Sequence, residues 1–244
     1  MVKSYGNSAA LTEFEGSNPR IKLSFESRKS VFLKEAIMSG TKIKVCGLTR
    51  MQDIKYVNEA LPDYIGFVFA KSRRQISAET AHQLKVFLDN RITAIGVFVN
   101  ESIKTITNIC DRGIINSIQL HGDESEEYIR VLRKEVNVPI IKAIRVKNMD
   151  SLKEAEQLSC DFLLLDAYSE KQIGGTGETF DWEFAKSIDK PFFLAGGIHV
   201  DNVKTAIEVA KPYCLDVSSG VETDGMKDGN KIQQLVKLVR EYCK

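Results

Sequence analysis

Cys46 and Asp166 are the residues of this sequence whose types and positions best suit acid–base chemistry. Cys46 follows an apolar run that begins near Ile43, and Asp166 ends the run Phe-Leu-Leu-Leu at 162–165. An ionised thiol acts as a base or nucleophile, and burial raises the pKa of a carboxyl group, which suits a general acid. The pair would supply one base and one acid for a proton-shuttling isomerisation. A structural buried cysteine, and an aspartate bonded to the amides of its own loop, are the alternatives.

The residues that follow Cys46 predict the start of a helix. Gly47 comes directly after the thiol, and Thr49 and Gln52 have the spacing of a capping box. A helix N-terminus stabilises nearby negative charge, so we expect it to favour the thiolate form of Cys46.

Three Gly- and Ser-rich turns follow three successive apolar runs. They are Gly174-Gly175-Thr176-Gly177, Ala195-Gly196-Gly197 and Ser218-Ser219-Gly220. Backbone amides exposed by small residues bind an anion without any Lys or Arg. Any one turn alone is also explained by the backbone freedom of glycine. Together the three turns predict a phosphorylated substrate.

Arg73, Arg74 and His121 complete the set of candidates. The two arginines lie in the polar segment 70–76 and would bind a carboxylate, although an exposed basic loop is the alternative and fits Arg73 better. His121 ends a further apolar run and is equally consistent with a site residue and with a hydrogen-bonded residue at a barrel rim.

Eight short apolar runs alternate with helical patterns and would position these residues. The runs begin near Ile43, Tyr64, Thr93, Ile115, Pro139, Asp161, Pro191 and Tyr213, at intervals of about 21 to 30 residues. Their continuous apolar character is typical of parallel strands covered on both faces. We predict an α/β fold, a (β/α)8 TIM barrel, whose carboxyl face carries the chemistry. A doubly wound sheet is the alternative, but no GxGxxG follows the first strand.

Composition excludes several classes of function. The chain has 244 residues, of which 43% are hydrophobic and 27% are charged, and its net charge is +1. A net charge this small creates no overall electrostatic field that would attract nucleic acid. No apolar run in the sequence is long enough to span a membrane. Five scattered cysteines without a CxxC pair argue against a disulfide framework and a zinc site, so we expect a cytoplasmic protein. The cysteines are Cys46, Cys110, Cys160, Cys214 and Cys243.

Residues 1–40 do not follow the repeat, which leaves 41–244 for the barrel. Only Ile21, Leu23 and Phe25 alternate in this extension as a strand would. We expect the extension to be flexible and dispensable, with Met38 as the natural start of translation. The rival expectation is that its apolar residues pack against the amino face of the barrel.

Seven ordered segments between residues 42 and 244 match one known family. They are Lys-Val-Cys-Gly-Leu-Thr-Arg (44–50), Gly-Phe-Val-Phe (66–69) with Ser-Arg-Arg-Gln-Ile-Ser (72–77), Gly-Val-Phe-Val-Asn (96–100), Gln-Leu-His-Gly-Asp-Glu (119–124), Leu-Leu-Leu-Asp (163–166), Gly-Gly-Thr-Gly-Glu-Thr-Phe-Asp-Trp (174–182) and Asp-Val-Ser-Ser-Gly-Val-Glu (216–222). The set resembles phosphoribosylanthranilate isomerase of tryptophan biosynthesis.

The resemblance implies a ribulose-phosphate-binding barrel that catalyses an Amadori rearrangement. N-(5-phospho-β-D-ribosyl)anthranilate would become 1-(2-carboxyphenylamino)-1-deoxy-D-ribulose 5-phosphate, without metal or cofactor, in a monomer or homodimer. The family match makes Cys46 the general base and Asp166 the general acid. It also implies a set of substrate-binding residues: Arg74, His121, Gly175, Gly177, Gly196, Gly197, Asp216, Ser218, Ser219 and Gly220.

The sequence departs from the family at one place and leaves two other functions open. Ala70 leads directly into Lys71 where the family usually has a proline, so Arg73 is an alternative to Arg74 as the anthranilate ligand. Another phosphate-binding barrel enzyme, such as indoleglycerol-phosphate synthase, would need a Lys/Glu set at the strand tips that we do not find. A non-catalytic phosphate-binding module would not need both Cys46 and Asp166.

Overall fold

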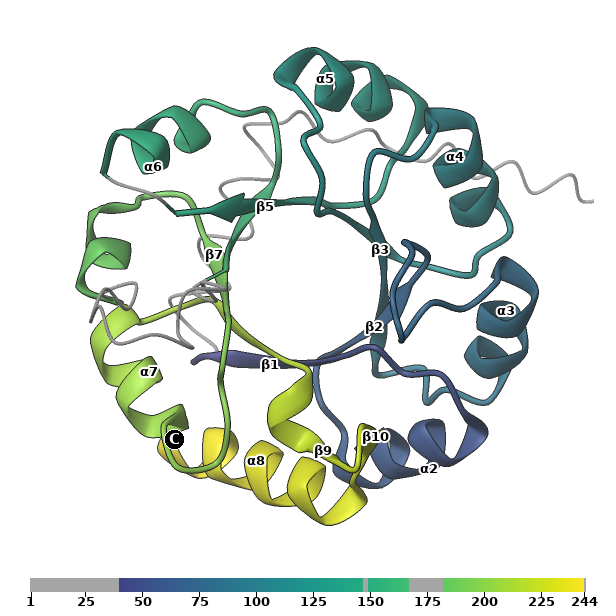
Figure 1. The fold of residues 1–244 in the computed structure, drawn as a ribbon, viewed down its shortest axis with the longest axis vertical. Coiled ribbons are helices and arrows are strands. Elements are labelled where there is room, and N and C mark those ends of the chain that lie inside the picture. The colour runs from purple at the N-terminus through teal and green to yellow at the C-terminus, as the bar shows by residue number, and fades with distance from the viewer. Residues whose placement is uncertain (1–39, 147–148, 167–181, 244) are drawn as a thin grey trace, which may run out of the picture.

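A closed barrel of eight parallel strands forms the centre of the protein (Figure 1). The computed structural model describes residues 40–146, 149–166 and 182–243. The strands are β1 (Lys42–Cys46), β2 (Tyr64–Val68), β3 (Thr93–Phe98), β4 (Ser117–Leu120), β5 (Ile140–Arg145), β6 (Phe162–Asp166), β7 (Phe192–Ala195) and β8 (Cys214–Val217). Each pairs with the next, and β8 closes on β1 with Asp216 opposite Lys44. The predicted barrel is confirmed, and every strand begins within two residues of its predicted position.

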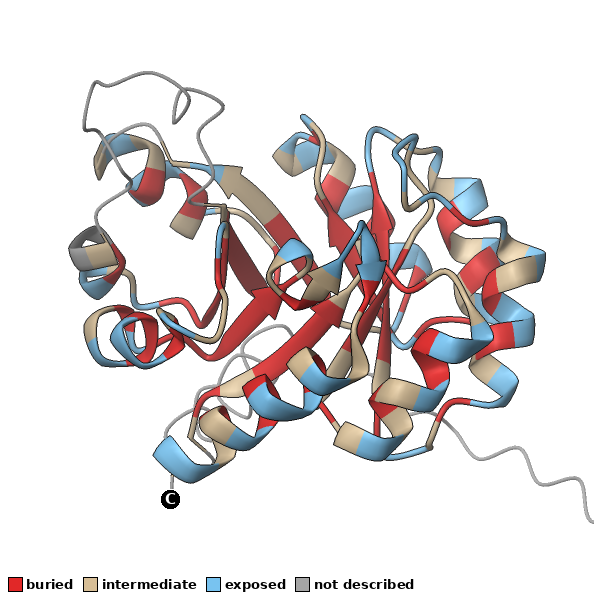
Figure 2. Ribbon diagram, turned by 60° about the horizontal axis from the view of Figure 1, so that its bottom comes forward, coloured by how far each residue is buried: buried red, intermediate tan, exposed pale blue. Residues whose placement is uncertain are grey.

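Helices surround the barrel and cover the outer face of its strands (Figure 1). They are α2 (Met51–Ala60), α3 (Ala78–Val86), α4 (Ile103–Asp111), α5 (Glu126–Glu135), α6 (Met149–Glu156), the 3-10 helix η2 (Trp182–Ser187), α7 (Val203–Ala210) and α8 (Gly229–Tyr242). A short 3-10 turn, η3 (Ser219–Val221), and a hairpin, β9 (Glu222–Thr223) with β10 (Met226–Lys227), separate β8 from α8. Buried residues concentrate on the strands, and exposed ones on the outer helix faces (Figure 2).

The interior of the barrel changes from apolar to polar towards the carboxyl ends of the strands. An apolar cluster that includes Phe162 and Phe193 fills the part near the amino ends. Lys44, Gln119 and Asp216 are buried in the part nearer the carboxyl ends. Burying a polar group costs free energy unless the group is hydrogen-bonded or ion-paired. The side chains in this region therefore require a network of hydrogen bonds.

The start of α2 differs from the predicted capping box. The helix begins at Met51, and Asp53, rather than Gln52, accepts hydrogen bonds from the backbone N–H groups of Thr49 and Arg50 at 2.9 and 3.0 Å. The Asp53 carboxylate is buried and also binds the Arg50 guanidinium, which fixes it in place. An ionised carboxylate is a stronger acceptor than an amide at this position, because its hydrogen bonds are charge-assisted.

Some predictions lie outside the described residues. These are the extension up to residue 39, and Gly175 and Gly177 of the predicted glycine-rich turn at 174–177. No helix within the described ranges is long and apolar enough to cross a membrane.

Candidate active site

The carboxyl ends of the strands surround a cavity of about 600 Å³. Every predicted site residue within the described ranges lines it: Cys46, Arg73, Arg74, His121, Asp166, Gly196, Gly197, Asp216, Ser218, Ser219 and Gly220. Cys46 comes from the tip of β1 and Asp166 from the tip of β6. The closed barrel therefore brings together residues that lie far apart in the sequence.

The position of Cys46 depends on a glycine of the neighbouring strand. Gly66 pairs with Cys46 across β1 and β2, and a Cβ atom on Gly66 would lie 2.6 Å from Cys46 Sγ. That distance is well inside van der Waals contact, so only glycine leaves room for the thiol in this place. Gly66 thus determines where the sulfur sits in the cavity.

The acidity of Cys46 differs from what its place before a helix predicts. Burial raises the pKa of the thiol above its usual value, although Lys44 and Lys227 act to lower it. The predicted effect of the helix start is therefore outweighed by desolvation, which disfavours the thiolate. A thiolate at this site depends on the nearby ammonium groups.

A chain of polar contacts runs from the interior of the barrel to the cavity wall. Lys44 Nζ donates to Asp216 Oδ2 at 2.7 Å and to Gln119 Oε1 at 2.6 Å. Gln119 Nε2 lies 2.8 Å from His121 Nδ1, and His121 Nε2 lies 3.6 Å from Asp166 Oδ2. His121 therefore faces Asp166 at the cavity wall while the amide below holds its ring. Asp216 Oδ1 is buried with no hydrogen-bond partner among the described residues.

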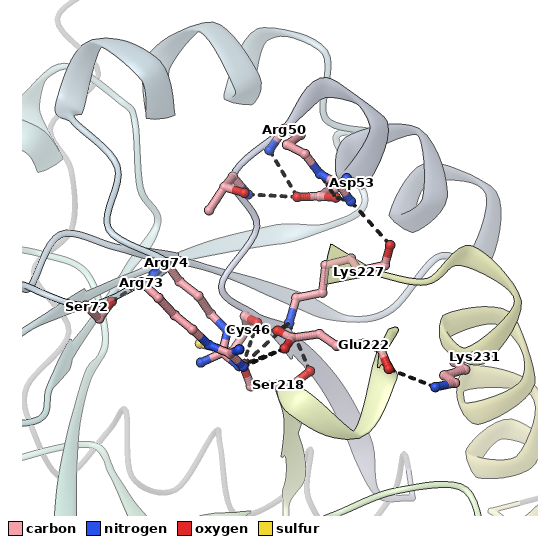
Figure 3. A network of polar contacts seen from close by, with 11 residues as sticks. Cys46, Arg50, Asp53, Ser72, Arg73, Arg74, Ser218, Glu222, Lys227 and Lys231 are labelled. Carbon is pink, nitrogen blue, oxygen red and sulfur yellow. Dashed lines mark hydrogen bonds and ion pairs between the residues drawn. The ribbon is translucent and has the colours of Figure 1, made fainter. Parts of the chain in front are cut away.

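Arg73 and Arg74 converge on a single carboxylate (Figure 3). Arg74 binds Glu222 through Nε and Nη2 at 2.8 and 3.0 Å, and Arg73 Nη2 lies 2.7 Å from the same group. Lys227 Nζ donates to Glu222 at 2.8 Å from the other side. The Arg74 side chain is 23% exposed and that of Arg73 58%. Arg74 is less exposed than Arg73, and its guanidinium contacts both oxygens of the Glu222 carboxylate. Arg74 therefore has the better geometry for binding a carboxylate.

The glycine turns after β7 and β8 differ in whether a side chain would fit at the glycine. Gly197 has φ +66°, and a Cβ there would meet nothing within 4 Å. A Cβ on Gly220 would lie 2.0 Å from the carbonyl oxygen of Ile198, so this position needs glycine for packing alone. The Ser218 hydroxyl donates to the carbonyl oxygen of Cys46 at 3.1 Å, which ties the turn after β8 to the tip of β1.

Four residues of the site were not predicted as functional: Lys44, Gln119, Glu222 and Lys227. Lys44 precedes Cys46 by two residues, so the alternation of a strand places both on the same face of β1. Gln119 stands two residues before His121 in the same way. That alternation was the signal available in the sequence, whereas nothing in it pairs Glu222 with two arginines from the loop after β2.

The fold and the cavity define a (β/α)8 barrel whose candidate reactive groups lie at the carboxyl ends of the strands, where enzymes of this fold have their active sites. The sequence profile described as N-(5'phosphoribosyl)anthranilate (PRA) isomerase matches residues 43–238. The N-(5'-phosphoribosyl)anthranilate isomerase of Endomicrobium trichonymphae is 48% identical over 199 residues, which cover 82% of this chain and 98% of that protein. The enzyme of the same name from Acetivibrio thermocellus is 46% identical over 210 residues, with 82% and 96% covered. The chain belongs to the N-(5'-phosphoribosyl)anthranilate isomerase family.

Solved structures of the family share the fold. The phosphoribosyl anthranilate isomerase of Thermotoga maritima superposes with a TM-score of 0.73 at 35% identity, and 82% of this chain and 99% of that one are covered. A phosphoribosyl anthranilate isomerase in complex with reduced 1-(o-carboxyphenylamino)-1-deoxyribulose 5-phosphate gives a TM-score of 0.70 at 33% identity, with the same coverage.

Proposed function

We propose that this chain converts N-(5'-phosphoribosyl)anthranilate into its 1-deoxyribulose 5-phosphate isomer, as an aldose–ketose isomerase of tryptophan biosynthesis. The observation that carries the proposal is that Cys46 and Asp166 line one cavity together with a bidentate arginine and two glycine turns. Membership of the isomerase family supports the same reaction. So does the compound bound to a relative, which has the carbon skeleton of the product.

Asp166 and Cys46 divide the proton transfers of the rearrangement. Asp166 donates a proton to the furanose ring oxygen as the C1'–O bond breaks, which leaves an iminium at C1'. The Cys46 thiolate then removes the proton from C2', and the C–H electron pair moves into a C1'–C2' double bond. The resulting enolamine tautomerises to the ketone. Substrate and product are isomers, and general acid and base groups suffice for each of these steps.

The remaining residues hold the two charged ends of the substrate. Arg74 is proposed as the ligand of the anthranilate carboxylate, because it lines the cavity and its pair with Glu222 uses Nε and Nη2, which leaves Nη1 as a further donor. The turns at 196–197 and 218–220 are proposed to bind the phosphate through backbone amides, the recurring arrangement after strands seven and eight of such barrels. His121 and Asp216 would contact the sugar between these ends, since both line the same cavity.

The product of the reaction tests this proposal. The purified chain is incubated with N-(5'-phosphoribosyl)anthranilate, whose fluorescence is lost on isomerisation, and the product is identified by mass. A product of unchanged mass is expected. Ring closure of the indoleglycerol-phosphate synthase type starts from the ketone, so such an enzyme would leave N-(5'-phosphoribosyl)anthranilate unchanged. It would release water and carbon dioxide only when it is given 1-(2-carboxyphenylamino)-1-deoxy-D-ribulose 5-phosphate. No enzyme-dependent change with either compound would indicate a binding module.

A further inference from the structure

Lys44 is a charged group inside the barrel that the reaction above does not use. Its side chain has no exposed surface, and its ammonium lies between the Asp216 carboxylate and the Gln119 amide. Burial by itself would lower the pKa of Lys44, but Asp216 and Cys46 outweigh it and raise the pKa above its usual value. Lys44 is thus a fixed positive charge that is buried away from water. A buried ion pair adds little to the free energy of unfolding, because desolvation of its charges offsets their attraction.

One side of Lys44 faces the proposed base. Cys46 lies two residues further along β1, on the same face of the strand as Lys44, and the positive charge of Lys44 acts to lower the pKa of its thiol. The other charged groups near the thiol are Asp216 on β8, which opposes ionisation, and Lys227 on β10, which favours it. The Arg74 side chain lies against Gly47, the residue that follows Cys46. Among these cations Lys44 lies nearest to Cys46 in the sequence. Its side chain, like that of Lys227, is buried from the solvent that would screen its charge.

The other side of Lys44 acts on the proposed acid through two hydrogen bonds. An ammonium only donates, so the Gln119 atom 2.6 Å from Lys44 Nζ must be the amide oxygen. The Gln119 nitrogen is then the atom that faces His121 Nδ1, and it donates to that nitrogen. A ring that accepts at Nδ1 carries its proton on Nε2. That N–H faces Asp166 Oδ2 at 3.6 Å.

We propose that Lys44 is a positioning residue for both halves of the reaction: its ammonium, held by Asp216 and Gln119, supplies the positive charge beside the Cys46 thiolate and fixes the His121 tautomer that faces Asp166. The proposal rests on the proposed function for the roles of Cys46 and Asp166. The arrangement of Lys44, Gln119 and His121 is a property of the fold, and it can be measured without turnover.

The experiment compares the wild-type chain with Lys44→Met, which keeps the length of the side chain and removes its charge. The rate of alkylation of Cys46 by iodoacetamide is followed against pH by mass analysis of the Cys46 peptide, which separates it from the other cysteines. We expect the midpoint to rise by at least one pH unit, so that alkylation at pH 8 slows about tenfold. The acidic limb of kcat should move in the same direction, with KM within threefold.

The matched control is Lys190→Met. Lys190 is also a buried lysine beside a cysteine, with Nζ 3.9 Å from Cys160 Sγ, but it lies before β7 at the opposite end of the barrel. This variant should lose stability without shifting the alkylation midpoint of Cys46 or the acidic limb of kcat. In ¹⁵N-histidine spectra, His121 should change its tautomer population in Lys44→Met and keep it in Lys190→Met.

An unchanged alkylation midpoint or an unchanged His121 tautomer in Lys44→Met would overturn the proposal, even where Cys46→Ser is inactive. If Cys46→Ser keeps its activity, the proposed function fails, while the alkylation midpoint still decides the role of Lys44. Should Lys44→Met not fold, Gln119→Met removes the amide that joins Lys44 to His121. The His121 tautomer population should then change, and an unchanged population in the folded variant would overturn the proposal.

Discussion

Replacing Gly66 with alanine tests whether the position of the sulfur limits catalysis. The new Cβ would lie 2.6 Å from Cys46 Sγ and 3.1 Å from Cys46 Cα. Side-chain atoms in contact lie about 3.5–4.0 Å apart, so the sulfur must move by about 1 Å. A displacement of that size costs about 100-fold in rate, or about 2.7 kcal/mol in the activation barrier. Overpacking should lower the free energy of unfolding by about 1–3 kcal/mol.

The assay follows the loss of substrate fluorescence at saturating substrate, with stability measured by urea unfolding. Gly96→Ala is the matched control, because a Cβ on this β3 glycine would lie 2.7 Å from Ile115 Cδ1 and 2.8 Å from Phe98 Cε2 without meeting Cys46. It should lose similar stability and keep kcat within threefold. The reasoning is refuted if folded Gly66→Ala keeps kcat within threefold of the wild-type chain, or if Gly96→Ala loses as much activity.

Three further predictions concern the phosphate, the arginine cluster and the extension. In Gly197→Ala the new Cβ would contact no other atom, and the positive φ would cost about 1–2 kcal/mol of backbone strain. The KM for substrate should rise at least tenfold, and inorganic phosphate should compete more weakly. An unchanged KM would mean that the phosphate binds elsewhere. Burial would raise the pKa of Glu222, but Arg74 and Lys227 hold it at about 2, below the 4.5 of a free side chain. This ion-pair stabilisation is therefore present above pH 4.5 and lost as pH falls through 2. The advantage in unfolding free energy over Glu222→Gln should shrink in acid. A constant difference from pH 7 to 2 would contradict this. A chain beginning at Met38 should keep its kcat and melt within a few degrees of the full chain, and a large fall in Tm would make the extension part of the fold.

The sequence predicted the barrel because its signal is repeated eight times. Parallel strands covered on both faces must be apolar along their whole length, and runs such as 162–165 show this directly. The turns between them could be located for the same reason. The placement of Cys46 and Asp166 in one cavity follows from the closure of the barrel, since the carboxyl ends of all eight strands meet there.

What the sequence did not predict depends on side chains that meet across the barrel. The partners of Lys44 lie 75 and 172 residues away, so no local pattern pairs them. The helix start after Cys46 predicted a site that favours the thiolate, but burial raises the pKa of the thiol, and the depth of burial of a thiol is not visible in a sequence. The helix start itself was misplaced, because a buried carboxylate at Asp53 takes the bonds that the capping pattern assigned to Gln52.

The most direct test of the account compares kcat in Cys46→Ser and Asp166→Asn with the binding of a product analogue. The reduced 1-(o-carboxyphenylamino)-1-deoxyribulose 5-phosphate found in a relative serves as the probe. Each variant loses one acid–base group and keeps the shape of the site, so kcat should fall by about two to four orders of magnitude while the analogue Kd stays within threefold. A kcat near that of the wild-type chain in either variant would contradict the assigned role of that residue. Loss of analogue binding with the fold intact would make it a binding residue instead.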